Sequence, residues 1–144
     1  MVLGTAVVVG GSVAIGATAP HWPDRWLERD VGPLRLTRFD RAEAYERLGV
    51  RRARSIFPEA GALFGGTSKR AAPDRADPDA VRAYLIEVRR AEWVHWLSMG
   101  CWLPLPFFAR TWVAVGLLVP TSAVNGTAQL ILRYHKVRLL DVAR

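Results

Sequence analysis

The hydrophobic residues of this chain gather in two stretches, residues 2–19 and 93–132, on either side of a polar middle. The first stretch is rich in glycine, and as a helix rising about 1.5 Å per residue it just crosses a hydrocarbon core of about 30 Å. A cleaved signal peptide is the alternative, because residues 17–19 read Ala-Thr-Ala, as a cleavage site does. No Lys or Arg precedes the apolar run, however, so we expect an uncleaved N-terminal transmembrane helix in residues 1–20.

The second hydrophobic stretch predicts a helical hairpin. A helix start is indicated by Asp77, Pro78 and Asp79, which supply an N-cap, a proline at the first helical position and an acidic first turn. The helix then continues without a break into the apolar residues 93–108, and residues 111–132 run back as a second apolar helix. The apolar residues 93–108 are too few for a full crossing, so this part of the hairpin either tilts, thins the bilayer or re-enters.

The polar middle reads as short helices and loops. Residues 37–48 have the clearest amphipathic pattern, and Gly49 follows them as a C-cap. Little or no β-structure is expected. The predicted fold is an all-α membrane protein with one N-terminal transmembrane helix (residues 1–20), a small helical cytoplasmic or interfacial region (21–77), and a long helix with a C-terminal membrane hairpin and basic tail (78–144).

Charge gives the orientation and narrows the partners. The chain has 20 Lys and Arg against 13 Asp and Glu, and most of the basic residues lie in the polar middle and the C-terminal tail. The positive-inside rule therefore places both regions in the cytoplasm and Met1 outside, in a multi-pass protein of the cell membrane. Arginine suits anionic lipid headgroups or a phosphorylated ligand. Nucleic acid is disfavoured as a partner, because no aromatic residues alternate with the basic ones.

Two polar features of the hairpin could carry chemistry. Glu92 and His95 are three residues apart and share a helix face, so the carboxylate could orient the imidazole as an acid/base unit. On the last helix, Asn125, Gln129 and Arg133 belong to a stripe that recurs every four residues on an otherwise apolar rod. Polar groups at membrane depth are functional candidates. Hydrogen bonding between helices is the alternative, and Arg133 is expected to pair with Glu92.

The Gly-rich residues 61–70 end in Lys69 and Arg70 and could cradle a phosphate, although their spacing is not that of a P-loop. An exposed loop is the alternative. The acidic residues and histidines of the hairpin match no metal signature, so neither a metal site nor a cofactor is expected.

Two motifs resemble a known family. Residues 90–96 read Arg-Ala-Glu-Trp-Val-His-Trp, and one hairpin later Asn125 is followed by Arg-Tyr-His-Lys-Val-Arg-Leu at residues 133–139. Over about residues 84–141 the chain resembles the glycosyl-4,4'-diaponeurosporenoate acyltransferases, which place a fatty acyl chain on the glucose of a bacterial carotenoid. The resemblance implies membership of that family.

We therefore expect a membrane-embedded O-acyltransferase that moves a fatty acyl group from acyl-CoA to a hydroxyl of a glycolipid or glycosylated isoprenoid. His95, oriented by Glu92, would take the hydroxyl proton, and transfer would be direct because no Ser or Cys nucleophile motif is present. Leu132, His135 and Lys136 depart from the family pattern of Gln, Asn and Arg, which bears on the acceptor more than on the fold. The expected substrate-binding residues are Arg89, Arg90, Asn125, Gln129, Arg133, Tyr134, Arg138 and Lys69.

The alternative function is a non-catalytic membrane subunit that braces a larger cell-envelope complex for lipid transport or synthesis. In that case Glu92, His95 and Arg133 would form a buried polar lock. A lipid-sized groove open beside His95 would favour the enzyme, and a filled, solvent-free cluster would favour the lock.

Overall fold

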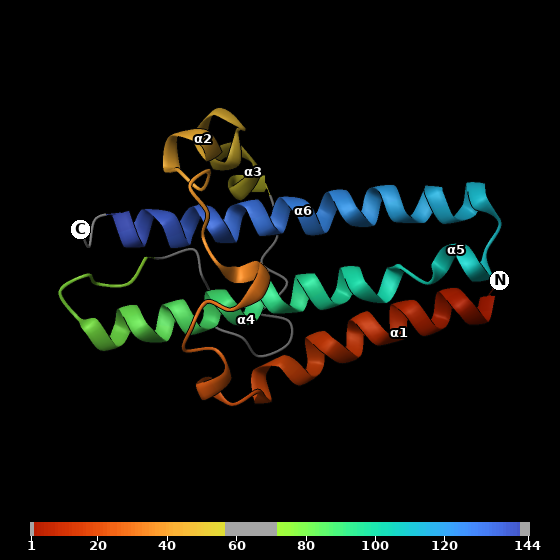
Figure 1. Cartoon of the computed structure of the whole chain (residues 1–144), viewed down its shortest axis with the longest axis horizontal. Coiled ribbons are helices and arrows are strands. Elements are labelled where there is room, and N and C mark those ends of the chain that lie inside the picture. The colour runs from red at the N-terminus through yellow and green to blue at the C-terminus, as the bar shows by residue number, and fades with distance from the viewer. Residues whose placement is uncertain (1, 57–71, 142–144) are drawn as a thin grey trace.

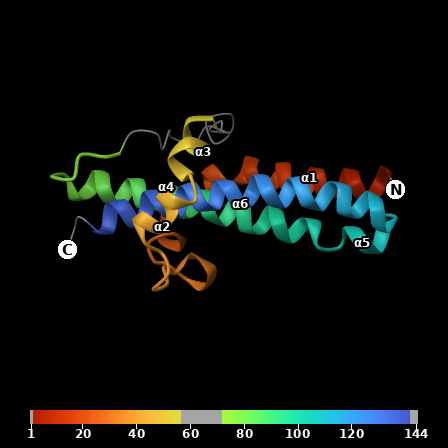
Figure 2. The same ribbon diagram turned by 90° about the horizontal axis from the view of Figure 1, so that it is seen from above.

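Three long helices lie side by side along the long axis of the molecule (Figures 1 and 2). The computed structural model describes residues 2–56 and 72–141. The long helices are α1 (Val2–Thr18), α4 (Pro78–Trp102) and α6 (Thr111–Asp141), and α4 lies between the other two and runs antiparallel to both. No strand occurs in the described residues, so the all-α prediction is confirmed for them.

The central helix α4 begins where the sequence predicts. Oδ1 of Asp77 accepts hydrogen bonds from the backbone N–H groups of Asp79 and Ala80, at 2.9 and 3.1 Å. These bonds satisfy two of the donors that the start of a helix leaves open. At its other end α4 stops before Pro104, and the short helix α5 (Leu105–Phe108) leads the chain back into α6. The predicted helical hairpin is therefore present.

The polar middle forms a connector that crosses α4 and an arm that rests on α6 (Figure 1). The connector contains three single turns of 3-10 helix, η1 (Ala19–His21), η2 (Asp24–Trp26) and η3 (Gly32–Leu34). The arm consists of the two short helices α2 (Ala42–Arg47) and α3 (Val50–Ile56).

The first helix of the arm starts later than residues 37–48 predict. The backbone N–H and the hydroxyl of Thr37 both bond to Oδ2 of Asp40, at 2.5 and 2.8 Å, and this side-chain turn takes the place of the first helical turn. Gly49 ends α2 as expected. Its φ of +77° lies in the left-handed region that glycine adopts readily, and the chain turns there into α3.

The core is divided between the two ends of the bundle. One cluster, made by Tyr45, Val50, Tyr134 and Val137, fastens the arm to α6. The other cluster, made by Val8, Leu105 and Ala114, joins α1, α5 and α6 at the opposite end. Apolar packing therefore joins the long helices at the α5 end, whereas at the other end it joins the arm to α6.

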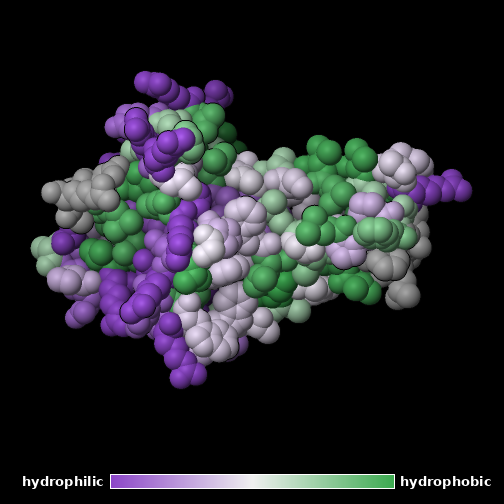
Figure 3. Space-filling view, viewed as in Figure 1, coloured by the Kyte–Doolittle hydropathy of each residue, from purple (hydrophilic) through white to green (hydrophobic). Residues whose placement is uncertain are grey.

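Hydropathy separates the two ends of the molecule. Hydrophilic residues gather at the end that carries the arm and the end of α6, and apolar residues gather towards α5 (Figure 3). At the α5 end, Phe107 is 87% exposed and Trp112 is 71% exposed. Apolar surface of this kind marks a lipid or protein contact. We call the end with the connector, the arm and the C-terminal part of α6 the polar half, and the end with α5 the apolar half.

Among the described residues, one helix is long and apolar enough to cross a membrane, over residues Thr111–Leu140. The expected N-terminal helix does form, but α1 has 17 residues and does not qualify as such a span. A helix of that length covers about 26 Å, less than a hydrocarbon core of about 30 Å. The candidate span is thus C-terminal, where we had expected one at the N-terminus as well.

Candidate functional site

A buried ion pair joins α4 to α6 in the polar half. Nζ of Lys136 lies 2.7 Å from Oε2 of Glu92, and neither side chain has exposed surface. The ammonium also donates to Oδ1 of Asp30 at 3.0 Å and to the carbonyl oxygen of Leu34 at 2.8 Å. Its three hydrogens therefore have three acceptors, which a buried ammonium requires if it is to remain charged.

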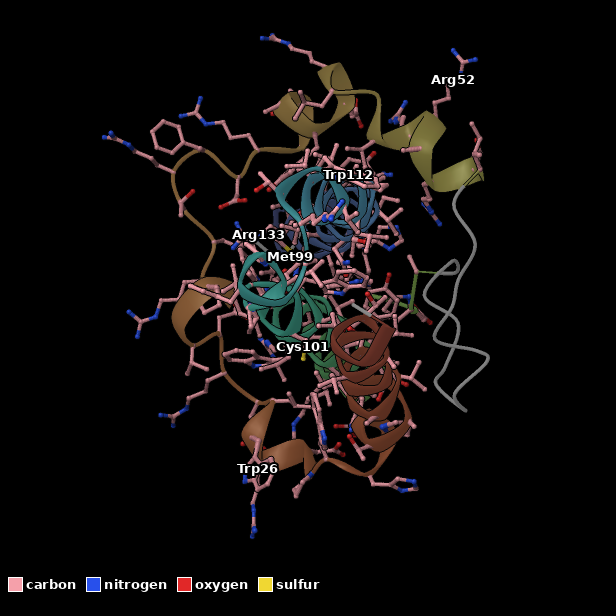
Figure 4. All side chains as sticks on the ribbon, turned by 90° about the vertical axis from the view of Figure 1, so that its right-hand side faces the viewer. Trp26, Arg52, Met99, Cys101, Trp112 and Arg133 are labelled. Atoms are coloured by element: carbon pink, nitrogen blue, oxygen red, sulfur yellow. The ribbon has the colours of Figure 1, made fainter. Side chains whose placement is uncertain are left out.

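Arg133 lies about one turn earlier on α6, between that helix and the connector (Figure 4). Its guanidinium donates to Oδ1 of Asp40 at 2.9 Å and to the carbonyl oxygens of Pro33 and Arg35 at 2.6 and 3.0 Å. Its Nε lies 3.7 Å from Oε1 of Glu92, so the predicted Arg133–Glu92 pair is confirmed as an ion pair without a hydrogen bond.

Two arginines of α4 hold the connector as well. Arg89 donates to Oδ1 of Asp30 at 2.8 Å and to the carbonyl oxygen of Leu27 at 3.2 Å. Arg90 is 7% exposed. It donates to the carbonyl oxygens of Ala19 and Trp22 at 2.7 and 2.8 Å, to Oδ1 of Asp24 at 2.7 Å and to Oε1 of Glu87 at 3.0 Å. These guanidinium groups bind the protein itself, and their role in binding substrate stays a prediction.

His95 lies one turn beyond Glu92 on α4 and is half-buried. Its Nδ1 is 2.8 Å from Oδ1 of Asn125 on α6. The amide nitrogen of Asn125 donates to the carbonyl oxygen of Thr121 at 2.9 Å, and this bond fixes which end of the amide faces the imidazole. Because Oδ1 can only accept, Nδ1 of His95 carries the hydrogen. In the neutral ring, Nε2 is then the nitrogen without a hydrogen.

Gln129 continues the polar stripe between Asn125 and Arg133. Its Nε2 donates to the backbone carbonyl oxygen of Glu92 at 2.9 Å, and the residue is 7% exposed. Its Oε1 is buried and accepts no hydrogen bond in the structure. All three residues of the stripe therefore contact the Glu92–His95 segment of α4, as their spacing predicts. These contacts link α4 to α6, which is what the alternative interpretation of the stripe predicts.

The remaining predicted residues lie apart from His95. Tyr134 is buried and fastens the arm, because its hydroxyl donates to Oε1 of Glu46 at 2.8 Å and accepts from Nε of Arg51 at 3.2 Å. Arg138 is exposed, with its guanidinium 5.7 Å from the centroid of the Tyr134 ring. Lys69 and the rest of residues 61–70 lie outside the described residues.

The charged network lowers the pKa values of two connector carboxyls. Burial raises the pKa of Asp30, but hydrogen bonds and charges from Arg89 and Lys136 outweigh burial and hold the pKa below its usual 3.8. Burial likewise raises the pKa of Asp40. Hydrogen bonds from the hydroxyl of Tyr45 and from the backbone and hydroxyl of Thr37 lower it again. With the charge of Arg133 they bring the pKa of Asp40 below 3.8. Both carboxyls are therefore ionised when the connector is docked.

Glu92, which precedes the apolar part of α4, responds differently. Burial raises the pKa of this carboxyl, and the bond from Lys136 and the charge of Arg133 offset only part of the rise. Among the carboxyls of the network, Glu92 thus accepts a proton more readily than Asp30 or Asp40. Within the described residues, no group of three or more His, Cys, Asp or Glu side chains is placed to hold a metal ion.

Sequence reasoning missed Lys136, Asp30 and Asp40 as parts of the site. A signal existed for Lys136, which lies seven residues after Gln129 and so returns to the same helix face after two turns. No such signal existed for the two aspartates, because they lie in irregular chain whose path depends on the helices it crosses. The filled cluster around Glu92 matches the expectation for a polar lock, whereas His95 retains exposed surface.

The fold and the site define a small helical protein with an ion-paired polar half and an exposed apolar half. Residues 23–144 match the family model described as CrtO, glycosyl-4,4'-diaponeurosporenoate acyltransferase. The chain belongs to this family, as its two motifs predict, and the match extends beyond residues 84–141 to the connector and the arm. No curated protein and no solved structure matches the chain. The family is one of acyltransferases for a glycosylated carotenoid, and the matched region contains the polar network and His95.

Proposed function

We propose that this chain is a membrane-embedded O-acyltransferase, which moves a fatty acyl group from acyl-CoA to a hydroxyl of a glycosylated isoprenoid or a related glycolipid. The family match supports the reaction class. The observation that carries the proposal is the contact between His95 and Asn125, because it places the ring hydrogen on Nδ1 and the lone pair on Nε2 of a half-buried imidazole.

In this proposal the apolar half lies in the cell membrane. The span of α6 crosses the bilayer, and α1 and the apolar part of α4 lie beside it with Met1 outside. The polar half and the C-terminus then face the cytoplasm. The distribution of Lys and Arg supports this orientation, because Arg110 is the basic residue at the turn between α5 and α6 and the other basic residues that the structure describes lie in the polar half. His95 would lie near the boundary, where a lipid-linked sugar and a water-soluble donor can meet.

The chemistry needs one base and a fixed geometry. Nε2 of His95 takes the proton of the acceptor hydroxyl as its oxygen attacks the thioester carbonyl carbon. A C–O bond forms, the C–S bond breaks, and the imidazolium returns the proton to the leaving thiolate. Asn125 holds the ring in the required tautomer, the role that Glu92 has in the sequence-based prediction. A neutral amide orients the ring without adding a charge beside it.

The remaining cations have separate parts in the proposal. Glu92 and Lys136 position α4 against α6, and Arg89, Arg90 and Arg133 keep the connector in place. Arg138 is exposed and is the candidate for a phosphate of the donor, with Lys69 as the second. One of these cations could also stabilise the negative charge that develops on the carbonyl oxygen during acyl transfer.

The proposal is tested with purified protein, labelled acyl-CoA and a glycolipid extract that contains glycosylated carotenoid, with products identified by mass spectrometry. His95→Ala should lower the rate by about 10²–10⁴-fold, the usual contribution of a general base. His95→Gln keeps a similar size and polarity but cannot serve as the base, so it should be equally inactive. Full activity of either variant would end the catalytic proposal.

A non-catalytic subunit is the second candidate, and the solvent-free Glu92–Lys136 pair favours it. This candidate predicts that the purified chain transfers no acyl group alone and co-purifies with a larger membrane complex. It also predicts that Glu92→Gln disturbs the protein more than His95→Ala does, since neutralising Glu92 leaves buried cations without their partner.

A further inference from the structure

The arm has an outer face that neither the bundle nor the proposed reaction uses. Its inner side chains, Tyr45 and Val50, pack on α6 and are buried. Three large apolar side chains are exposed on the arm and on the segment just before it, Phe39, Leu48 and Ile56, which are 72%, 68% and 73% exposed. What sets these exposed apolar side chains apart from scattered ones is the charge that surrounds them.

The charge around these side chains is positive. The exposed arginines of this face and its edges are Arg35, Arg38, Arg41, Arg47, Arg51 and Arg52. Of the nearby acids, Asp40 pairs with Arg133 and Glu46 pairs with Arg51 at 2.9 Å, and the exposed Glu43 offsets one of the remaining arginines. The guanidinium of Arg38 lies 4.8 Å from the centroid of the Phe39 ring, so cation and aromatic ring form one surface. The outer face of the arm therefore suits an anionic partner with an apolar layer.

The position of the arm points to the membrane surface. The arm projects sideways from the second half of α6, and the connector occupies the same stretch of the long axis on the other side of α4 (Figure 1). This is the stretch where the hydrophilic part of the surface meets the apolar part (Figure 3). Trp26 of the connector and Arg52 of the arm point away from the bundle on opposite sides (Figure 4). A membrane that surrounds the apolar half would thus end beside the arm.

We propose that the arm is a docking surface for anionic phospholipid. It would lie along the cytoplasmic surface of the membrane that α6 spans, with Phe39, Leu48 and Ile56 between the headgroups and with Arg47 and Arg52 on lipid phosphates. Mixed basic and apolar surfaces bind membranes in this way. The inference rests on the membrane placement in the proposed function and is independent of acyl transfer.

The test places one environment-sensitive fluorophore on the arm of the full chain. Cys101 is first replaced by serine, and Leu48→Cys is labelled. The protein is reconstituted in vesicles of phosphatidylcholine alone, or of phosphatidylcholine with an equal amount of phosphatidylglycerol. Quenching by acrylamide, a neutral probe, reports exposure to water. We expect the label to be several-fold less quenched in the anionic vesicles, and a label at Ala83→Cys, an exposed residue near the start of α4, to be quenched equally in both.

Two charge variants give the matched comparison. A basic residue near an anionic surface is worth about fivefold in partitioning, so Arg47→Gln with Arg52→Gln should lower the docked fraction relative to the undocked one by up to about thirtyfold. Arg75→Gln with Arg82→Gln removes the same charge from the far end of the polar half and should leave protection unchanged. Equal quenching in both lipids, or equal effects of the two pairs, would overturn the proposal. So would protection by free acyl-CoA in neutral vesicles, which would make the face a donor site.

Extraction at alkaline pH separates this proposal from the membrane span. A protein that alkali removes while its label remains protected by phosphatidylglycerol would contradict the span and still support docking of the arm. A protein that resists alkali with an unprotected label would support the span and contradict docking.

Discussion

The two halves of this molecule are held together by different forces. In the polar half, four buried or half-buried cations of α4 and α6 reach defined oxygen atoms; they are Arg89, Arg90, Arg133 and Lys136. In the apolar half, α1, α5 and α6 meet through side chains such as Val8, Leu105 and Ala114. Hydrogen-bonded charges specify one geometry, whereas apolar packing in lipid gains little from the hydrophobic effect and depends on close contact.

For the proposed function, this difference bears on where a reaction centre can be placed. His95 lies one turn from Glu92, so the ion pair that fixes α4 against α6 also fixes the distance between His95 and Asn125. A 2.8 Å contact between two helices needs such support, since a shift of about 1 Å is enough to cost a large part of catalysis. In the proposed function, the polar half thus fixes the geometry of the site, and the apolar half attaches the protein to the membrane.

The largest expected effect comes from removing Lys136. Lys136→Met keeps the length of the side chain but leaves the Glu92 carboxylate buried without its closest cation and removes a partner of Asp30. The free energy of unfolding should fall by about 3–5 kcal/mol, as for other broken buried pairs. Thermal unfolding in detergent measures the loss. Arg82→Gln is the control, because its pair with Glu28 is exposed and is worth about 1 kcal/mol or less. Equal losses for the two variants would mean that the buried pair has no special weight.

A smaller effect is expected from a cavity in the apolar half. Leu105 has no exposed surface, and Leu105→Ala removes its contacts with Val8 and Ala114. In a water-soluble core this change costs about 2–5 kcal/mol. In lipid the transfer term is small, so we expect about 1–2 kcal/mol from lost van der Waals contact. The measurement is again thermal unfolding in detergent, beside Lys136→Met. A loss as large as that of Lys136→Met would contradict the assignment of the apolar half to a lipid environment.

The same contrast decides what the sequence could predict. The start of α4 and the hairpin could be predicted, because an N-cap, prolines and apolar runs are local signals. The face of α6 that carries Asn125, Gln129 and Arg133 could also be predicted from its period. Their partners could not, because spacing shows which residues share a face but not which residue of the opposite helix lies closest.

Glu92 and His95 illustrate this limit. Their spacing places them on one face, and the sequence-based hypothesis joins them to each other. Helix α6 supplies a partner for each, with Lys136 for the carboxylate and Asn125 for Nδ1 of the imidazole. The membrane assignment was limited in a similar way. Composition alone made residues 1–20 a span, but the helix that forms has 17 residues, and the candidate span is the continuous α6.

Acid should weaken the polar half before the apolar half. The pKa values of Asp30 and Asp40 are lowered in the folded protein by Arg89, Lys136 and Arg133, against the effect of burial. Each of these carboxylates stabilises the folded protein fully at pH values above its unfolded-state pKa of 3.8. This stabilisation is lost as the pH falls through the lower pKa of the folded state. The contribution of Asp30 and Asp40 to the unfolding midpoint should therefore be constant from neutral pH to about pH 5 and be lost below about pH 4, whereas the raised pKa of Glu92 acts in the opposite direction.

Asp40→Asn provides the comparison for this titration. It removes one of the two acid-sensitive groups, so it should lower stability at neutral pH and flatten the decline in acid. The same steep decline in Asp40→Asn would assign the acid sensitivity to other carboxyls.

The smallest effect is expected where the apolar half has room. A Cβ added at Gly11 of α1 would lie 3.4 Å from Sγ of Cys101 on α4, which is close to ordinary van der Waals contact. Alanine also favours a helix interior over glycine by about 0.8–1.0 kcal/mol. Gly11→Ala should therefore leave stability unchanged or raise it by up to that amount in thermal unfolding, whereas Gly11→Leu should push α1 away from α4 and lower it. If Gly11→Ala were as damaging as Gly11→Leu, the packing of α1 against α4 could not accommodate even one methyl group. The geometry of the apolar half would then be as tightly fixed as that of the polar half.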